Sequence, residues 1–153
     1  MKKEKAISSH ALAAKQIRAE LKKEFPSVKF RVIARTFSGG DSIRIEWKNS
    51  IPAQQVDNVV NKYAYGKFDG MTDYYDCTNV RSDISQVKYI SIYREITEDI
   101  YNIYFDKFKV RNDGWDKLSS IDEASRNLLE KWGTWTARNY IYRKLVDVDL
   151  TTI

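Results

Sequence analysis

The sequence predicts an α+β fold, in which a small antiparallel three-stranded sheet of order α-β-β-α-loop-β carries two C-terminal helices packed on it. Residues 28–48 alternate between apolar and basic side chains around a double glycine, as in a β-hairpin. Apolar residues recur at spacings of three and four on both sides of this segment, as in helices. A chain of 153 residues, 42% of them hydrophobic, can form one core. We therefore expect a single domain over 1–153, with an α-β-β-α-β module at 8–95 and a helical extension at 96–153 docked on it.

The first helix is expected to begin at Ser8 or Ser9, because a serine hydroxyl can cap the free backbone N–H groups of a helix. It should end near Glu24, since Pro26 cannot continue it. Its buried face is predicted from the helical spacing of Ala14, Ile17, Leu21 and Phe25.

The two strands of the hairpin each have one apolar side and one basic side. Gly39-Gly40-Asp41 supplies the turn between them. The apolar side is formed by Val28, Phe30, Val32, Ala34, Ile43, Ile45 and Trp47. The other side is formed by Lys29, Arg31, Ile33, Arg35, Arg44, Glu46 and Lys48. Because successive side chains in a strand point to opposite faces, the apolar side should face the core.

The middle of the chain predicts a helix, a long loop and a third strand. Pro52 is suited to the first position of a helix whose buried stripe is Val56, Val59, Val60 and Tyr63. Residues 64–86 are rich in Gly, Asp, Tyr and Asn and predict an ordered loop with short turns. Residues 87–94 predict a strand with Tyr89, Ser91 and Tyr93 on one side.

The C-terminal part predicts two helices. Thr97, followed by two acidic residues, caps the first, which Asn112-Asp113-Gly114 should end. Ser120 and Glu123 form a capping box for the last helix. One helix cannot bury aromatic rings around its whole circumference, so some of them would suit a homodimer or partner interface. The candidates for that interface are Trp132, Trp135, Tyr140 and Tyr142.

The basic side of the sheet is the main candidate site. The net charge of +5 favours encounter with polyanions. Cationic side chains would hold phosphates and tyrosine rings would stack on bases. The predicted nucleic-acid-binding residues are Lys29, Arg31, Arg35, Arg44, Lys48, Tyr89 and Tyr93. The alternative is a solvated face, or one buried under the C-terminal helices.

Other chemistry has weaker support in the sequence. Asp69, Asp73 and Asp76 could hold a hard cation, but their spacing fits turn and cap roles better. His10 is the only histidine and lies in a lysine-rich terminal region, where we expect it to be exposed. Cys77, the single cysteine, is expected to be an ordinary thiol. We expect no cofactor, no catalytic residues and no membrane segment, and a cytoplasmic location in a bacterial host.

Four segments resemble a known family. They are Ile17 to Pro26, Val28-Lys29-Phe30, Gly39 to Trp47, and Phe68 to Asp73, and a strand at Lys88-Tyr89-Ile90 extends the match. In this order they resemble the large polyvalent protein-associated domain 29 family of phage and conjugative-element proteins, over about residues 14–94. The resemblance implies a protein that accompanies mobile DNA and takes part in the conflict between that element and its host. It implies no activity and no catalytic residues.

The sequence therefore predicts a non-catalytic accessory protein of a mobile element that binds nucleic acid through a basic sheet face. The alternative is a protein-binding inhibitor of a host defence system, acting through the C-terminal helices. A metal-dependent nuclease using the three aspartates is the third and weakest hypothesis.

Overall fold

The structure of the protein is a computed structural model that describes residues 8–109 and 137–151. Packing divides the chain into two compact units. The first unit comprises residues 1–47 and 53–94, and the second comprises Lys48–Pro52 and Glu95–Ile153. The α+β class is confirmed. Docking of the helical extension on the α-β-β-α-β module stays a prediction.

The first unit contains a three-stranded sheet of order β1-β2-β5, formed by β1 (Arg31–Phe37), β2 (Gly40–Lys48) and β5 (Tyr89–Glu95). β1 and β2 pair antiparallel, in a register that runs from Arg31 opposite Glu46 to Phe37 opposite Gly40. Gly40 has φ +142°, a conformation that favours glycine, and an added Cβ would lie 2.8 Å from the Lys88 side chain. The predicted hairpin is confirmed, but its turn consists of Ser38 and Gly39, and Gly40 and Asp41 already belong to β2.

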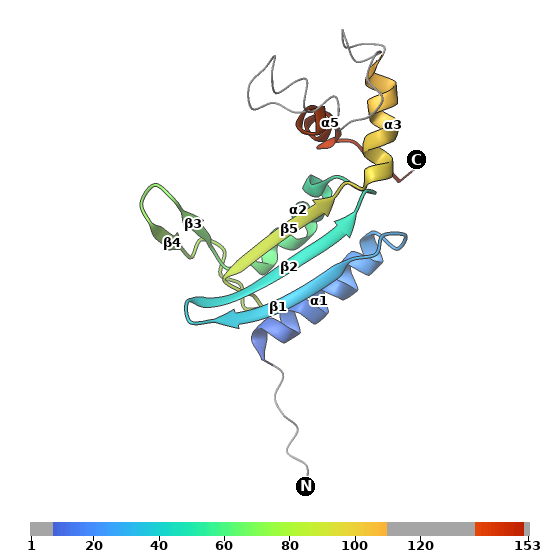
Figure 1. Ribbon diagram of the computed structural model, residues 1–153. Coiled ribbons are helices and arrows are strands. Elements are labelled where there is room, and N and C mark those ends of the chain that lie inside the picture. The colour runs from blue at the N-terminus through green and yellow to red at the C-terminus, as the bar shows by residue number, and fades with distance from the viewer. Residues whose placement is uncertain (1–7, 110–136, 152–153) are drawn as a thin grey trace. The chain divides into compact units, whose positions relative to one another are not determined.

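The expectation of a wholly antiparallel sheet is wrong for β5, which runs in the same direction as β2 (Figure 1). At the start of both strands the Lys88 N–H donates to Asp41 Oδ1 at 2.8 Å. At their ends the Asn49 N–H donates to the Glu95 carbonyl at 2.7 Å. The chain between β2 and β5 passes through a helix and returns to the end of the sheet at which β2 begins. β5 therefore runs parallel to β2.

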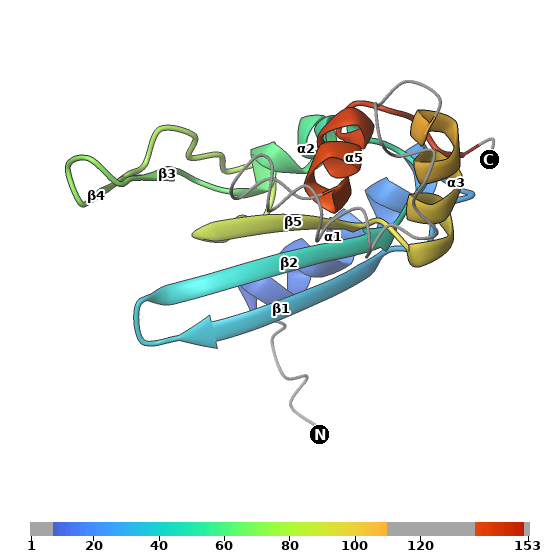
Figure 2. The ribbon, with the colours of Figure 1, turned by 45° about the horizontal axis from the view of Figure 1, so that its top comes forward.

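Two helices cover one side of this sheet, α1 (Ser9–Glu24) and α2 (Ala53–Val60), the latter followed by the short η1 (Asn61–Tyr63). Both lie behind the sheet in Figure 1, and Figure 2 shows α1 along the β1–β2 hairpin. α1 has the bounds that the sequence predicts. The core between helices and sheet is built from Ala13, Ala14, Ile17, Leu21, Val32, Ile43, Ile45, Trp47, Val56, Val60, Tyr63 and Val87.

A short hairpin interrupts the segment expected to be a loop, and that expectation is wrong for residues 67–76. β3 (Lys67–Asp69) pairs antiparallel with β4 (Tyr74–Asp76), with Phe68 opposite Tyr75. The backbone closes tightly at its base, where a Cβ on Gly66 would lie 2.1 Å from the Asp76 carbonyl oxygen. In Figure 1 this hairpin extends beyond the start of β5.

The second unit contains α3 (Glu98–Lys109) and α5 (Ala137–Leu145). Thr97 precedes α3, as predicted, and its hydroxyl hydrogen-bonds Asp99. The buried cluster of this unit consists of Ile100, Phe105, Ile141, Leu145 and Leu150. The break predicted at 112–114 and the capping box of Ser120 lie outside the described residues. Within the described part of the chain, no helix is long and apolar enough to span a membrane.

A polar cluster joins α1 to η1 through Glu20. The Lys62 ammonium donates to Glu20 Oε1 at 2.5 Å, and the Tyr63 hydroxyl donates to Oε2 at 2.6 Å. Burial acts to raise the pKa of Glu20, but the hydrogen bonds from Lys62 and Tyr63 outweigh it and leave the pKa below the ordinary 4.5. Burial and the same hydrogen bond raise the pKa of Tyr63, which therefore stays a neutral donor.

Glu20→Gln should lower the free energy of unfolding by about 1 kcal/mol at neutral pH, because a charge-assisted acceptor is lost from a partly exposed site. The folded-state pKa of Glu20 is lowered, so its stabilisation is present above pH 4.5 and is lost as the pH falls through the folded-state value. Urea unfolding at several pH values should show the difference from wild type shrinking in acid. Glu24→Gln, an exposed carboxylate one turn later on α1, is the control. A difference that stays constant into acid would contradict the role of the Glu20 charge.

Candidate nucleic-acid interface

The side of the sheet opposite α1 and α2 carries most of the predicted site residues, and we call it the open sheet face. Arg31, Arg35 and Arg44 are exposed on it, whereas their neighbours Val32, Ile43 and Ile45 are buried on the helix side. The cross-strand register pairs Ile33 with Arg44 and Arg35 with Ser42. The open sheet face consists of Arg31, Ile33, Arg35 and Phe37 on β1, Ser42, Arg44 and Glu46 on β2, and Tyr89, Ser91 and Tyr93 on β5.

Two of the three guanidinium groups on this face share one carboxylate. Glu46 accepts from Arg44 Nε at 2.6 Å and lies 3.5 Å from Arg31 Nη1. Arg35 has no ion-pair partner among residues 8–109 and 137–151. The three arginines line a shallow hollow of about 260 Å³ together with Ile33 and Ser91. The open sheet face therefore keeps a net positive charge around a concavity.

Aromatic rings flank the arginines. The Arg44 guanidinium lies over the Tyr93 ring, 5.4 Å from its centroid. Phe37, which the sequence-based site did not include, stacks on Tyr89 with ring centroids 6.0 Å apart and an interplanar angle of 24°. The sequence could have placed Phe37 on this face, because it lies two residues after Arg35 in the same strand alternation. Charge and ring surface thus occur on the same face.

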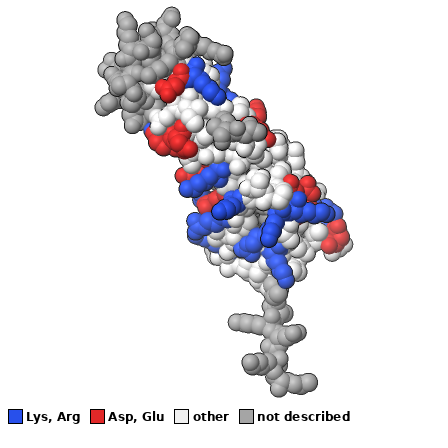
Figure 3. Space-filling model, turned by 90° about the vertical axis from the view of Figure 1, so that its right-hand side faces the viewer, with Lys and Arg blue, Asp and Glu red and all other residues white. Residues whose placement is uncertain are grey.

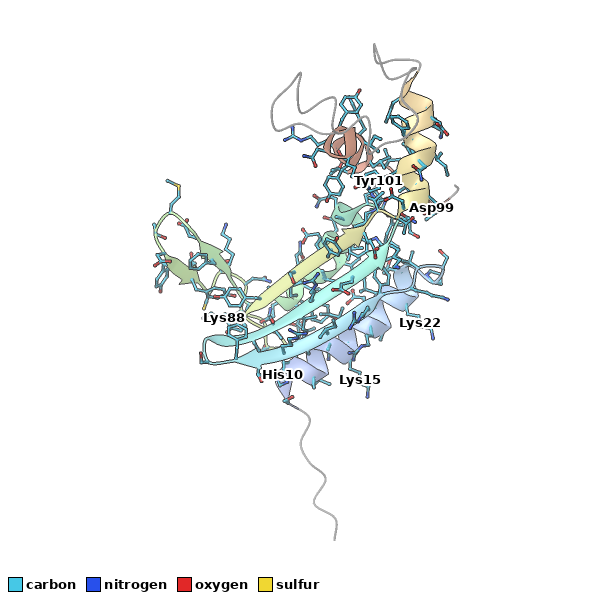
Figure 4. All side chains as sticks on the ribbon, viewed as in Figure 1. His10, Lys15, Lys22, Lys88, Asp99 and Tyr101 are labelled. Carbon is cyan, nitrogen blue, oxygen red and sulfur yellow. The ribbon has the colours of Figure 1, made fainter. Side chains whose placement is uncertain are left out.

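The β3–β4 hairpin adds a second set of rings, which the sequence did not predict because this segment has no clear period. Tyr75 meets Tyr89 edge-on, with centroids 5.4 Å apart, and meets Tyr65 in the same way at 5.7 Å. The Tyr75 hydroxyl donates to the Lys88 carbonyl, and the Lys88 ammonium lies over the rings of Tyr75 and Tyr89. Figure 4 marks Lys88 near the start of β5. Burial raises the pKa of Tyr75 to about 12, so its phenol remains neutral.

Comparison with known proteins gives one result that bears on this surface. The profile of large polyvalent protein associated domain 29 matches residues 8–100, more than half of the 153-residue chain. The chain belongs to this family. No curated protein and no solved structure gives a significant match. Membership in the domain 29 family supports a protein associated with phages or other mobile elements.

The domain 29 match extends beyond the predicted limits of 14–94 and covers the whole open sheet face. It ends at Ile100, near the start of α3, so the remainder of the helical extension lies outside it. The open sheet face is thus part of the domain 29 scaffold, whereas none of the four residues proposed for the C-terminal interface is.

Two of the predicted basic residues lie at the edge of the site. Lys29 is exposed and precedes β1 by two residues. Lys48 is the last residue of β2 and lies 3.6 Å from Glu95 in an ion pair of the second unit. We therefore centre the site of this domain 29 protein on Arg31, Arg35 and Arg44.

Basic residues also occur away from the open sheet face. Figure 3 shows Lys and Arg side chains gathered on the side of the molecule that it presents, with several Asp and Glu side chains among them. Lys15 and Lys22 are exposed on α1 and point away from the sheet (Figure 4). What distinguishes the open sheet face is the combination of arginine with aromatic rings, not charge alone.

The predicted metal ligands do not form a site in the described part of the chain, where no three His, Cys, Asp or Glu side chains gather to hold an ion. Asp69 instead caps its own turn, accepting from the Met71 N–H and the Thr72 hydroxyl at 2.9 Å each. Asp73 has φ +54° at the hairpin turn, and Asp76 ends β4. Cys77 is exposed, and His10 lies 3.3 Å from the Ser8 hydroxyl.

The predicted C-terminal interface is only partly described. Trp132 and Trp135 lie outside the described residues. Tyr140 packs against the buried cluster of the second unit and meets Phe108 edge-on, with centroids 5.7 Å apart. Tyr142 is 46% exposed. Of these four residues, Tyr142 is the one whose described surroundings leave a ring surface free for a partner.

Proposed function

We propose that this domain 29 protein is a non-catalytic accessory protein of a mobile element, which binds nucleic acid through the open sheet face. The observation that carries the proposal is the convergence of Arg31, Arg35 and Arg44 on one hollow beside Tyr93. Phosphate binding by Lys and Arg supplies most of the affinity of such proteins, and rings add stacking energy.

The charge balance supports an anionic ligand. Arg31 and Arg44 have side chains that are 74% and 53% exposed, so both can reach a ligand while Glu46 orients them. Fixed guanidinium groups lose less conformational freedom on binding a phosphate than mobile ones do. Glu46 also limits binding, because its carboxylate repels phosphate.

The experiment that tests the proposal is a salt titration of binding to fluorescent DNA and RNA oligonucleotides, read by anisotropy. Two to three phosphate contacts should give a log–log slope of affinity against salt of about −2 to −3 for a duplex and about −1.5 to −2 for a single strand. A slope near zero, or no binding at low salt, would sink the proposal. Comparison of DNA with RNA in the same buffer then identifies the preferred backbone.

A protein partner remains the second candidate function. The observation that favours it is the exposure of Tyr142 on α5 and of Val146 just beyond it, an aromatic and an aliphatic side chain four residues apart. A complex with a host defence protein that forms after nuclease treatment and is lost in Tyr142→Glu would support this function instead.

A further inference from the structure

Four aromatic residues continue from the open sheet face onto the β3–β4 hairpin, and we call them the aromatic row. Phe37 stacks on Tyr89, and Tyr89 meets Tyr75 edge-on. Phe68 lies directly opposite Tyr75 in the β3–β4 register, and opposite residues of an antiparallel pair point to the same side. The aromatic row is therefore Phe37, Tyr89, Tyr75 and Phe68.

Tyr75, one of the two inner rings of this row, is held in place by backbone contacts. The Tyr75 hydroxyl is bonded to the Lys88 carbonyl, which immediately precedes β5. Gly66 lets the hairpin close against Tyr75, since a Cβ there would lie 2.7 Å from the Tyr75 ring. A ring that is already ordered loses little conformational freedom when a planar ligand stacks on it.

The two ends of the row are open. Phe37 is 49% exposed and Phe68 is 52% exposed. Arg35 lies two residues before Phe37 on the same side of β1, so a cation with no described partner stands beside an exposed ring. This spacing suits a ligand that alternates anionic groups with flat aromatic ones.

We infer that the ligand of the open sheet face is single-stranded nucleic acid, whose bases stack on the aromatic row while Arg35 and Arg44 hold its phosphates. The inference rests on the proposed nucleic-acid-binding function and names its substrate class. In a duplex the flat faces of the bases are already stacked on one another, and only their edges are reachable in the grooves. Rings on a sheet can stack only on bases that are free of a partner strand.

The test compares three probes of one length, about 16 nucleotides, which covers the site sizes of single-strand-binding surfaces. They are a fluorescent single strand, the same strand annealed to its complement, and an abasic strand with the same number of phosphates. The single strand should bind at least about fivefold more tightly than the abasic strand, the smallest gain expected from one stacked base. It should also bind more tightly than the duplex.

Substitutions in the aromatic row test which rings the bases stack on. Phe37→Leu keeps an apolar side chain but removes the exposed ring, and should weaken single-strand binding between about 5-fold and 100-fold. Its effect on the abasic strand should be negligible. Phe68→Leu makes the same test at the hairpin end of the row. The matched control is Tyr74→Leu, because Tyr74 is an exposed ring on the opposite side of the same hairpin.

The outcomes separate this inference from the proposed function. Equal binding of the single strand and the abasic strand, or tighter binding of the duplex, would overturn the inference and leave phosphate binding by the arginines intact. Binding that does not depend on salt, or no binding of any of the probes, would refute both the inference and the proposed function. Thermal melting of each variant checks that the fold is retained. If Tyr74→Leu weakens binding as much as Phe37→Leu does, the aromatic row is not the stacking site.

Discussion

Reversing two charges, in Arg35→Glu/Arg44→Glu, is expected to weaken nucleic-acid binding by roughly 100-fold near physiological salt and to reduce the salt slope by about 2. Arg35 has no described ion-pair partner, so its charge is available to a phosphate. Arg44 is oriented by Glu46 at 2.6 Å and by the Tyr93 ring. Reversal replaces two attractive contacts with two repulsive ones at the centre of the hollow.

The matched control carries the same charge change on the opposite side of the sheet. Lys15→Glu/Lys22→Glu alters two exposed lysines of α1 that point away from the sheet (Figure 4). If net charge alone drives binding, both double variants will lose affinity equally, and the open sheet face is then not the site. If the site is as proposed, the control keeps its slope, and circular dichroism should show both variants folded.

Ile45→Ala is expected to lower the free energy of unfolding by about 2–5 kcal/mol. Ile45 is fully buried on the helix side of β2, the central strand of the sheet. Removing its outer carbons leaves a cavity that the surrounding β-sheet and helices can fill only in part. Urea denaturation measures the change in the free energy of unfolding.

The control for Ile45 is Ile33→Ala, which makes the same substitution on the open sheet face. Ile33 is half-buried and lines the hollow opposite Arg44. Its loss should change the free energy of unfolding by about 1 kcal/mol or less. A larger effect for Ile33 than for Ile45 would show that the core lies on the other side of the sheet from the one described.

The alternation of residues 28–48 was sufficient to predict the hairpin and which side chains share a face. The reason is that side chains alternate between the two faces of a strand. Once one residue is known to be buried, the face of every other residue in the strand follows. The limits of α1 at Ser9 and Glu24 were predicted from the serine pair and from Pro26. Ser8 takes the N-cap position, but its side chain makes no capping hydrogen bond. Arg31, Arg35, Arg44, Tyr89 and Tyr93 were placed on one face for the same reason.

The sequence by itself determined the class of the fold, the limits of α1 and the composition of both sides of the β1–β2 hairpin, because these depend on contacts between residues close in the chain. Only the tertiary structure decided that β5 runs parallel to β2 and that a hairpin interrupts residues 64–86. It also brought Phe37, Tyr75 and Tyr89 together, although Phe37 and Tyr89 are about fifty positions apart in the chain. Such long-range pairings depend on the path of the chain between β2 and β5 and on the close packing at Gly66. No local sequence pattern encodes either of these.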